Sequence, residues 1–398
     1  MILDYIRRQA EYQPNKPAIT TADETITYAQ LYQKMQNAEP LPIPLLGESW
    51  NGPFCLHTTG TTGIPKDIII SGDAVIANSE NLIDRIGFTP QQTFIIAGDM
   101  EHLGCWSKIF PVLMVGGTLH ILKDRMRDIE AFFRVMEDSE AAKPTADANG
   151  EARNAACRGK RFATFLVPSN IRILLQFSAE RLARLSHSID FIETGAAPMP
   201  HADMLELCRL MPQSRLFNTY ASTETGVICS YNYNDGRCLP GCCGKPMMNS
   251  EVIITSEGKI ACKGRTLCST AEGQQTIFVT NDNGYLDDEG MLHILGRQDD
   301  IINVGGYNVS PSEVEDVAMT LPDISDCICI ATPHPITTWA LKLLVVLSDG
   351  YQLDKRRIAK FINEKLERYK VPMQYEAVDH IERTANGKAN RKYYRQKG

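Results

Sequence analysis

Residues His57–Ile70 read HTTGTTGIPKDIII, and the other motifs of the chain are best interpreted from this stretch outward. Gly60 and Gly63 can adopt backbone angles that other residues avoid, Pro65 stiffens the exit, and consecutive amide groups can then line a nest for an anion. Lys66 adds a compact positive charge. Hydroxyl donors come from Thr58, Thr59, Thr61 and Thr62. The stretch predicts a phosphate-binding loop, although a threonine-rich surface hairpin with a solvated lysine has the same composition.

This loop differs from the Walker loop. The Walker pattern is GxxxxGK[ST], whereas here the two glycines are three residues apart and Lys66 follows a proline. The sequence therefore does not imply that the N-terminus of a helix surrounds the phosphates.

The composition narrows the class of protein. The chain has 398 residues, a net charge of -7 and a pI of about 5.7, which argue against a nucleic-acid or anionic-membrane partner. No apolar run approaches the length needed to span a membrane, and the charged N-terminus lacks the apolar core of a signal peptide. We expect a cytoplasmic protein.

The 12 cysteines are most simply free and buried in such a protein. Four of them cluster in the sequence: Cys229, Cys238, Cys242 and Cys243. Their spacing misses the usual CxxC pattern of a zinc knuckle, so it argues against a zinc site.

Apolar runs alternate with helix-length segments such as Ile171–Leu185. The runs are Phe94–Gly98, Thr118–Leu122, Thr164–Val167 and Phe191–Gly195. This alternation predicts an α/β fold whose large N-terminal domain is a mostly parallel sheet covered by helices. A helix from Ile2 and a strand pair at Ala18–Thr20 and Thr25–Tyr28 precede a proline-rich linker. The polar segment Asp138–Gly159 lacks an apolar period, and we expect it to be a mobile insertion.

Shorter strands begin at Glu251, which predicts a small β-rich subdomain. The expected strands are Glu251–Thr255, Lys259–Lys263 and Ile277–Asp282. Beyond a boundary near residues 296–300, we predict a small, mobile α+β C-terminal domain with helices at Ser312–Thr320 and Asp354–Tyr369 and strands at Cys327–Ala331 and Lys342–Leu347. The domains are therefore expected to span residues 1–298 and 299–398.

Four further motifs accompany the phosphate loop. They are GAAP at Gly195–Pro198, NTYASTE at Asn218–Glu224, the run from Thr280 to Glu315 that includes GRQD and GGYNV, and RTANGKANR at Arg383–Arg391. Together with TTGTTGIPK, in this order, they resemble the signatures of the acyl-adenylate-forming superfamily, which contains acyl- and aryl-CoA ligases, adenylation domains and luciferases. Among these members, the aryl-CoA ligases resemble the motifs of this chain most.

The resemblance implies that the loop and Lys66 cover the β- and γ-phosphates of ATP while Thr223 meets the α-phosphate. It also implies that Glu224 holds Mg²⁺, a hard cation that prefers oxygen ligands. Taken alone, Glu224 reads as a solvated loop carboxylate.

Nucleotide binding is the role that the resemblance implies for a second group of residues. Asp282 and Arg297 match the positions that engage the ribose hydroxyls, and the bare backbone of Gly195, Ala196 and Ala197 would lie against the adenine. Tyr220 would supply a stacking face, with Asn218 beside it in the same motif. Outside this context, Tyr220 also suits a core aromatic.

Three positions concern the C-terminal domain. Lys388 matches the lysine that reaches the reacting carboxylate and the α-phosphate, and Asp299 matches the hinge between the domains. Gly305 and Gly306 would line a tunnel for the thiol after the domain has turned. Without the other motifs, Lys388 reads as a solvated lysine in a Gly/Asn turn.

The acyl pocket is the least defined part of the site. His102 in MEHLGCW matches an aromatic position that gates this pocket in many relatives, although a core position suits it equally. Thr59, Ala221 and Asn281 replace the commoner residues of the motifs, and only residues 1–57 precede the loop. This short segment is compatible with a carrier-protein thiol, a small acyl group or a homodimer.

The sequence thus predicts an acid–thiol ligase that uses ATP and Mg²⁺ to activate a small carboxylic acid and then transfers the acyl group to CoA. A carrier protein with a phosphopantetheine arm is the alternative acceptor. A non-catalytic nucleotide-binding module is the alternative from another class, and the sequence does not identify the acid.

Overall fold

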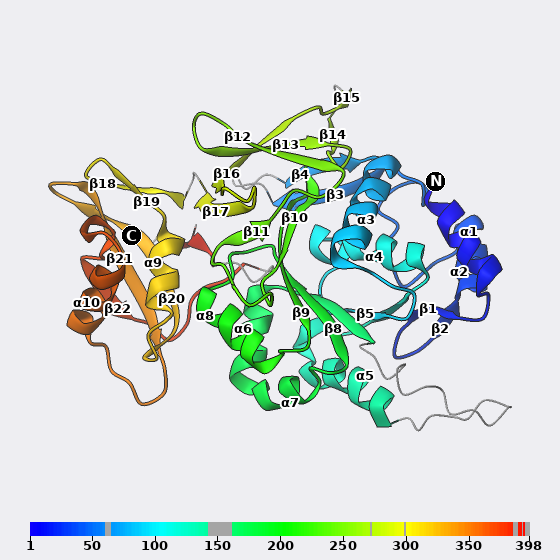
Figure 1. Cartoon of the computed structure of the whole chain (residues 1–398), viewed down its shortest axis with the longest axis horizontal. Helices are drawn as coiled ribbons and strands as arrows, with labels where there is room; N and C mark the ends of the chain where they lie inside the picture. The colour runs from blue at the N-terminus through cyan, green and yellow to red at the C-terminus, as the bar shows by residue number, and fades with distance from the viewer. Residues whose placement is uncertain are drawn as a thin grey trace.

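The computed structural model describes residues 1–59, 65–141, 161–270, 273–297, 300–384, 389–391 and 393–394. Its central feature is an eight-stranded sheet in the order β10-β9-β8-β7-β5-β6-β1-β2 (Figure 1). Neighbouring strands from β9 to β1 are parallel, and β10 and β2 pair antiparallel at the two edges. In chain order the strands are β1 Pro17–Thr20, β2 Thr25–Thr27, β5 Thr93–Ile96, β6 Thr118–Ile121, β7 Phe162–Leu166, β8 Ile189–Thr194, β9 Arg215–Ser222 and β10 Gly226–Asn232.

Helices cover both faces of this sheet. One core joins a sheet face to α1–α4, and a second core joins the other face to α5–α8. Successive residues of a strand alternate between the two cores, as Phe94 and Ile95 of β5 do, because strand side chains point to opposite faces. The helices are α1 Ile2–Tyr12, α2 Tyr28–Gln36, α3 Gly72–Ile86, α4 Leu103–Val115, α5 Ile129–Ala141, α6 Pro168–Phe177, α7 Ala179–Arg184 and α8 His201–Leu210.

The short N-terminal segment belongs to this core. β1 pairs with β6 in the main sheet, and Tyr28 donates to the carbonyl oxygen of Gly117 at 2.6 Å. Residues 1–36 therefore complete one end of the sheet and its helical cover.

Two smaller sheets lie beside the main one. The first has the order β15-β14-β4-β3, and the second has the order β11-β17-β16-β13-β12. The first contains β3 Phe54–Thr59, β4 Pro65–Ile70, β14 Ser269–Thr270 and β15 Gly273–Gln274. The second contains β11 Cys242–Gly244, β12 Ser250–Ile254, β13 Lys259–Gly264, β16 Phe278–Leu286 and β17 Leu292–Arg297. The strands predicted from Glu251 onward thus form a β-rich unit.

The last residues fold as a separate C-terminal unit, yellow to red in Figure 1, with a core of its own. Its three-stranded sheet, β20-β21-β22, is accompanied by the hairpin β18–β19 and by two helices. The elements are β18 Ile302–Val304, β19 Tyr307–Val309, α9 Pro311–Ala318, β20 Ile324–His334, β21 Thr338–Leu347, α10 Lys355–Lys365 and β22 Gln374–Ala377. The α/β class with a smaller C-terminal α+β unit is confirmed, whereas the proposed boundary falls at residues 298 and 299, outside the described residues.

Two predicted segments differ in detail. The helix expected over Ile171–Leu185 is broken at Ser178, which separates α6 from α7. The expected insertion begins too early, because residues 138–141 continue α5, whose buried Phe132, Phe133 and Met136 anchor it to the core. The remainder of that segment lies outside the described residues.

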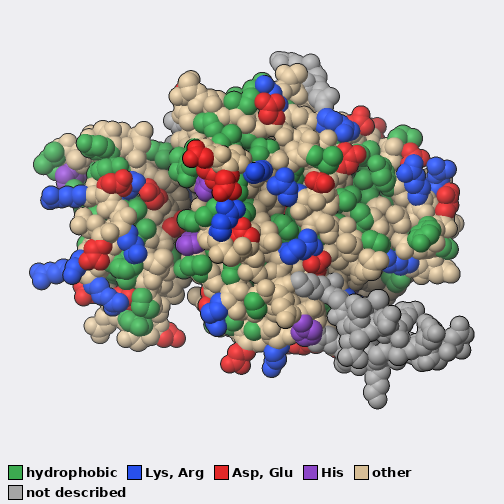
Figure 2. Space-filling model, in the orientation of Figure 1, with side chains coloured by type: hydrophobic (Ala, Val, Ile, Leu, Met, Phe, Trp, Pro, Cys, Tyr) green, Lys and Arg blue, Asp and Glu red, His purple; other side chains and the backbone are tan. Residues whose placement is uncertain are grey.

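Within the described ranges, no helix is both long and apolar enough to cross a membrane. On the face drawn in Figure 2, acidic and basic side chains are interspersed, without a large basic field.

Candidate active site

Several predicted motifs follow strands that end at one edge of the main sheet. β5, β7, β8 and β9 run parallel, so their carboxyl ends share this edge. His102 follows β5, Gly195–Ala197 follow β8, and Thr223 and Glu224 follow β9. Ligands of open parallel sheets bind outside the carboxyl ends of the strands. The fold thus brings together motifs that lie far apart in the sequence.

The backbone at Gly195 has no room for a side chain. A Cβ placed there would lie 2.9 Å from the carbonyl oxygen of Thr219 on the neighbouring β9. Ala196 follows with φ at 68°, the left-handed region that few side-chain-bearing residues adopt. The chain therefore leaves β8 through an exposed and constrained turn, a geometry that lets a flat ligand approach the backbone closely.

Thr223 and Glu224 occupy the turn between β9 and β10, and both are half-buried. The amide of Cys268 donates to the carbonyl oxygen of Glu224 at 2.8 Å. Ser269 in turn pairs with Ile69 of β4. Residues 268–269 thus link the Glu224 turn to the hairpin that carries the predicted phosphate loop.

Tyr220 and Asp282 form the closest polar contact among the predicted nucleotide-binding residues. The Tyr220 hydroxyl donates to Asp282 Oδ2 at 2.6 Å, and Thr280 Oγ1 lies 3.3 Å from the same hydroxyl oxygen. Burial first, and then the Asp282 charge, raise the pKa of the Tyr220 phenol well above its usual range, so it remains a donor at neutral pH. Arg297 is the cross-strand partner of Asp282 in β16–β17. The three predicted residues thus converge from β9, β16 and β17.

Asn218 has a structural contact of its own. Its side-chain amide donates to the carbonyl oxygen of Cys242 at 2.8 Å, and the residue is buried. This bond ties β9 to β11, so Asn218 supports the strand that carries Tyr220.

The predicted phosphate loop lies only partly within the described residues. Gly60, Thr61, Thr62 and Gly63 are outside them, and for Thr58, Thr59 and Lys66 only the backbone is described. That backbone forms an antiparallel hairpin in which Thr58 pairs with Lys66 and Thr59 pairs with Pro65. The backbone at the base of the loop therefore brings Thr58 and Lys66 into register on neighbouring strands.

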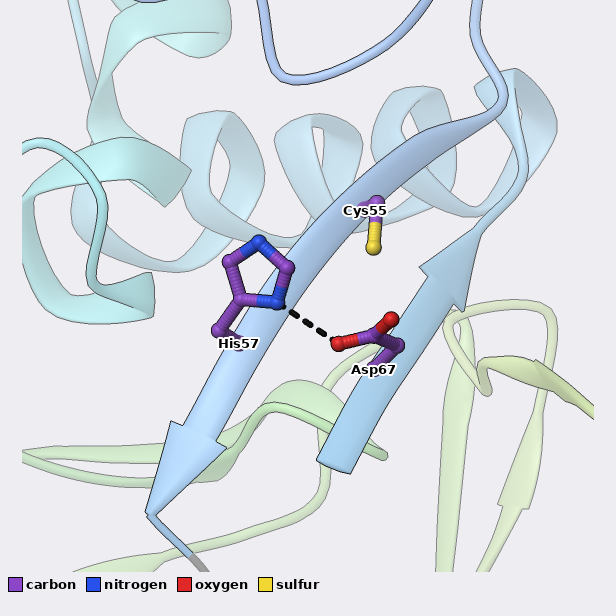
Figure 3. A group of neighbouring side chains, drawn as sticks. All are labelled: Cys55, His57 and Asp67. Atoms are coloured by element: carbon purple, nitrogen blue, oxygen red, sulfur yellow. Dashed lines mark hydrogen bonds and ion pairs between the residues drawn. The ribbon is translucent and has the colours of Figure 1, made fainter. Parts of the chain in front are cut away.

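Three side chains from β3 and β4 form, among the described residues, the one cluster of three His, Cys, Asp or Glu residues that could hold a metal ion (Figure 3). The potential ligand atoms of Cys55, His57 and Asp67 lie within 4.8 Å of one another. His57 Nδ1 and Asp67 Oδ1 already form a contact of 2.7 Å, however, and burial followed by Asp67 raises the pKa of the Cys55 thiol. We assign the His57–Asp67 contact to holding the two strands together.

The predicted acyl-pocket residue, His102, is the exposed N-cap of α4.

The sequence did not predict a buried charge pair that involves the same helix. Lys108 Nζ lies 2.7 Å from Glu193 Oε1 of β8, and both side chains are about 1% exposed or less. Lys108 also lies 5.4 Å from the centre of the Phe165 ring. The sequence did contain a signal for this buried pair, because Lys108 and Glu193 are each a charged residue within an otherwise apolar run.

The two predicted thiol-tunnel glycines are exposed in the β18–β19 hairpin. The Gly305 amide donates to the carbonyl oxygen of Thr337 at 3.3 Å, within the C-terminal unit. In this structure they are thus held against their own unit. Lys388 and Asp299 lie outside the described residues.

The donor set suits the groups that the motifs imply. Glu224 offers a half-buried carboxylate beside the Thr223 hydroxyl, and oxygen donors are what Mg²⁺ requires. At Gly195, a Cβ would clash with the carbonyl oxygen of Thr219, so a side chain there would displace the turn that follows β8.

Sequence comparison identifies the class. The AMP-binding enzyme family matches residues 49–266, and the AMP-binding enzyme C-terminal domain matches residues 313–388. The 2-succinylbenzoate–CoA ligase of Lactococcus lactis subsp. lactis is 32% identical over 380 residues, which cover 93% of this chain and 77% of the relative. The indoleacetate–CoA ligase of Aromatoleum aromaticum is 26% identical and covers 93% of this chain and 72% of the relative.

Solved structures share the fold. The o-succinylbenzoate CoA synthetase of Bacillus subtilis, in complex with its acyl-adenylate intermediate, aligns with a TM-score of 0.76 at 19% identity and covers 98% of this chain and 97% of that chain. An amide bond synthetase from Marinactinospora thermotolerans aligns with a TM-score of 0.78 at 18% identity, covering 100% of this chain and 99% of that chain.

The chain belongs to the AMP-binding enzyme family, and it is a ligase of the acid–thiol class that forms AMP and pyrophosphate.

Proposed function

We propose that this protein activates a small carboxylic acid with ATP and transfers the acyl group to the thiol of CoA. In the first step, a carboxylate oxygen forms a bond to the α-phosphorus of ATP while the bond to pyrophosphate breaks. In the second step, the thiol sulfur forms a bond to the acyl carbon, AMP leaves with the bonding electron pair, and the thiol proton passes to solvent or to a base.

The observation that carries the proposal is that two motifs meet at the carboxyl edge of one sheet: GAAP, which follows β8, and NTYASTE, which contains both Tyr220 and Thr223. Two of the closely similar relatives are ligases of aromatic acids by name, which supports an aromatic or similarly small acid and CoA for this chain. The acid itself is left to experiment.

Each residue has a chemical task in this proposal. Asp282, oriented by Tyr220, accepts hydrogen bonds from the ribose hydroxyls, and Arg297 completes that contact. The loop at Gly60–Gly63, with Thr58, Thr59 and Lys66, binds the outer phosphates, while Thr223 positions the α-phosphate. A magnesium ion held by Glu224 would supply charge neutralisation between phosphates.

Lys388 is the residue that we propose to stabilise the charge that develops at the α-phosphate. Removal of a group of this kind typically costs roughly 10²–10³ in rate. In Lys388→Ala we expect adenylation to fail while thiolation of a supplied acyl-adenylate continues, because Gly305, Gly306 and the hinge at Asp299 serve the second step. Equal loss in both steps would contradict this division of roles.

The decisive experiment measures pyrophosphate release from ATP and Mg²⁺ across a panel of aromatic, aliphatic and amino acids, each with and without CoA. Release that depends on one acid and turns over only with CoA establishes the proposed ligase. A single stoichiometric burst that CoA does not change favours a carrier protein with a phosphopantetheine arm. ATP binding without release for any acid, in a correctly folded sample, favours the non-catalytic module.

A further inference from the structure

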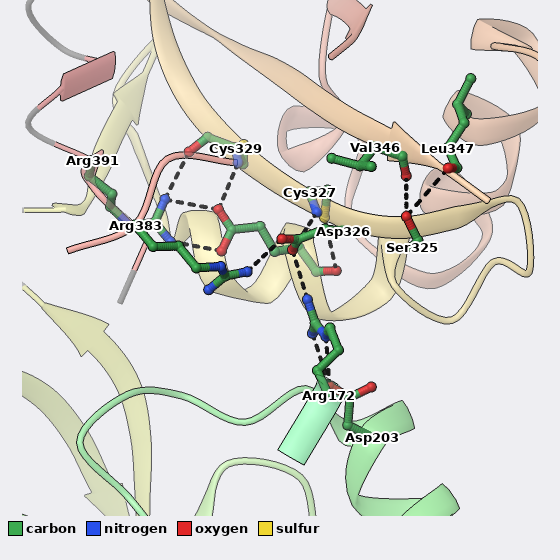
Figure 4. Close-up of polar contacts among 11 residues, drawn as sticks. Arg172, Asp203, Ser325, Asp326, Cys327, Cys329, Val346, Leu347, Arg383 and Arg391 are labelled. Carbon is green, nitrogen blue, oxygen red and sulfur yellow. Dashed lines mark hydrogen bonds and ion pairs between the residues drawn. The ribbon is translucent and has the colours of Figure 1, made fainter. Parts of the chain in front are cut away.

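Arg172 of α6 binds carboxylates from two separate parts of the molecule (Figure 4). Its Nε and Nη2 atoms donate to Asp203 Oδ2 of α8 at 3.0 and 2.9 Å, and its Nη1 atom donates to Asp326 Oδ1 of β20 at 2.7 Å. Asp203 belongs to the large α/β unit, whereas Asp326 belongs to the C-terminal unit. A single guanidinium group therefore connects the two units.

These side chains are largely removed from water. Arg172 is 13% exposed, Asp203 15% and Asp326 20%. Loss of Arg172 would leave two poorly hydrated carboxylates near each other without their shared cation, which is more costly than loss of an exposed ion pair. Removal of Arg172 is thus expected to destabilise the protein more than removal of one partner of an exposed ion pair does.

The contact lies beside a gap and not within a packed apolar interface. A cleft of about 590 Å³ runs between α6 and α8 on one side and residues 319–322, 324, 325 and 348 on the other, and Arg172 and Asp203 line it. The two units are therefore not closely packed along this cleft. Among the described residues, the contact of Arg172 with Asp203 and Asp326 is a polar connection between the units at its edge.

Asp326 continues the connection into the last motif of the chain. Its second oxygen, Oδ2, accepts from Arg383 Nη2 at 2.5 Å. Arg391, at the other end of RTANGKANR, binds both carboxylate oxygens of Glu315 at 2.7 and 2.8 Å. Both ends of this motif are therefore fixed to the C-terminal unit, and Asp326 connects one of them to Arg172.

We propose that Arg172 is a positioning residue for adenylation: through Asp326 it holds the Arg383 end of the last motif against the large unit, in the placement that the first half-reaction requires. This inference rests on the proposed function, because it assumes that the protein carries out both half-reactions. A positioning residue touches no substrate, so its removal should lower the rate constant of one step more than it weakens ATP binding.

The test compares Arg172→Met with the wild type in each half-reaction separately. Adenylation is followed as acid-dependent pyrophosphate release, and thiolation is started from a supplied acyl-adenylate and CoA. We expect the kcat of adenylation to fall about 10- to 100-fold, the size of effect that a small misplacement of reacting groups produces. The KM for ATP should change less than threefold, and thiolation should be unchanged or faster. Asp326→Asn should reproduce this pattern, and the double variant should be no worse than either single variant.

Arg209→Met is the matched control. Arg209 lines the same cleft from α8, is 67% exposed and pairs with Glu206 of its own helix. This variant should behave as the wild type in both half-reactions.

Parallel loss of both half-reactions, together with a lower melting temperature, would overturn the proposal and leave Arg172 a merely structural role. An unchanged adenylation rate in Arg172→Met would overturn it as well. If the wild type releases no pyrophosphate with any acid, the proposed function fails. Small-angle X-ray scattering then tests separately whether Arg172 connects the two units. Looser placement of the C-terminal unit in Arg172→Met than in Arg209→Met would support the connection, and identical scattering would refute it.

Discussion

The guanidinium of Arg172 lies 2.7 Å from the carboxylate of Asp326, although 154 residues separate them in the sequence. Arg172 sits on an ordinary amphipathic helix and Asp326 on an ordinary strand, so neither position carries a recognisable motif. Their relationship arises only because α6 and β20 meet where the two units of the molecule face each other. A residue outside every motif is thus connected to the last motif, because Asp326 also binds Arg383.

Loss of one partner of the buried Lys108–Glu193 pair should strongly destabilise the protein. Glu193→Ala leaves the ammonium of Lys108 buried without its carboxylate, which typically costs about 3–5 kcal/mol. Chemical denaturation followed by the signal of the large unit measures this loss. The control is Glu289→Ala, which breaks an exposed pair with Arg237 and should cost at most about 1 kcal/mol. Replacing both buried partners by apolar residues, as in Lys108→Met with Glu193→Leu, should recover most of the loss; no recovery would refute the charge argument.

A methyl group at Gly195 should weaken nucleotide binding. In Gly195→Ala the new Cβ would lie 2.9 Å from the carbonyl oxygen of Thr219, so the β8 turn must shift away from its present course. We expect at least a tenfold weaker Kd for ATP, measured by calorimetry, equivalent to about 1.4 kcal/mol. Gly290→Ala is the control, because no atom lies within 4 Å of a Cβ there and the change strains only a distant turn. Unaltered ATP affinity in Gly195→Ala would place the nucleotide elsewhere.

Removal of the Tyr220 hydroxyl should affect ribose recognition. Tyr220→Phe deletes the 2.6 Å hydrogen bond to Asp282 and frees that carboxylate to rotate. Hydrogen bonds to charged groups contribute about 1.5–3 kcal/mol, so a 10- to 100-fold higher KM for ATP is expected. The loss should be smaller with 2′,3′-dideoxy-ATP as substrate, because that analogue lacks the hydroxyls that Asp282 is proposed to bind. An equal loss with both nucleotides would show that Tyr220 acts on something other than the ribose contact.

Asp316 should make stability dependent on pH. Burial raises its pKa from 3.8 to about 8, and the charges of Glu315 and Glu313 on α9 and of Asp203 on α8 add to the effect, while Arg172 on α6 opposes it. The folded state thus keeps a proton that the unfolded chain releases near pH 4, so the free energy of unfolding falls as pH rises from about 4 to 8.

Asp316→Asn removes this titration. The free energy of unfolding of wild type minus that of Asp316→Asn should decrease by a few kcal/mol between pH 5 and pH 8.5, at about 1.4 kcal/mol per pKa unit. Denaturation at several pH values measures the difference. A difference that does not vary with pH would mean that Asp316 ionises normally in the folded protein.

Much of the fold follows from local patterns. The runs at Phe94, Thr118, Thr164 and Phe191 became β5–β8 because each is a short apolar segment buried on both faces of a parallel sheet. The insertion was predicted to start at Asp138 because residues 138–141 are polar or small. They are nevertheless helical, because they continue α5, which three buried side chains before them hold in the core. Within Ile171–Leu185, the indication of the break was Ser178 itself, a residue type that is favoured as the N-cap of a helix and that is the N-cap of α7 here.

The candidate site, like the fold, has one part that the sequence predicts and another that only the tertiary structure shows. Gly195, Thr223, Tyr220 and Asp282 belong to motifs whose residue types already indicate phosphate and sugar chemistry, so the sequence by itself determined the class of protein, and the nucleotide contacts of these residues stay a prediction. Only the tertiary structure decided which distant side chains meet: Tyr220 with Asp282, Lys108 with Glu193, and Arg172 with both Asp203 and Asp326. The physical reason is that motif chemistry is local to a few neighbouring residues. The energy of a buried charge, by contrast, depends on which partner the fold places within about 3 Å of it.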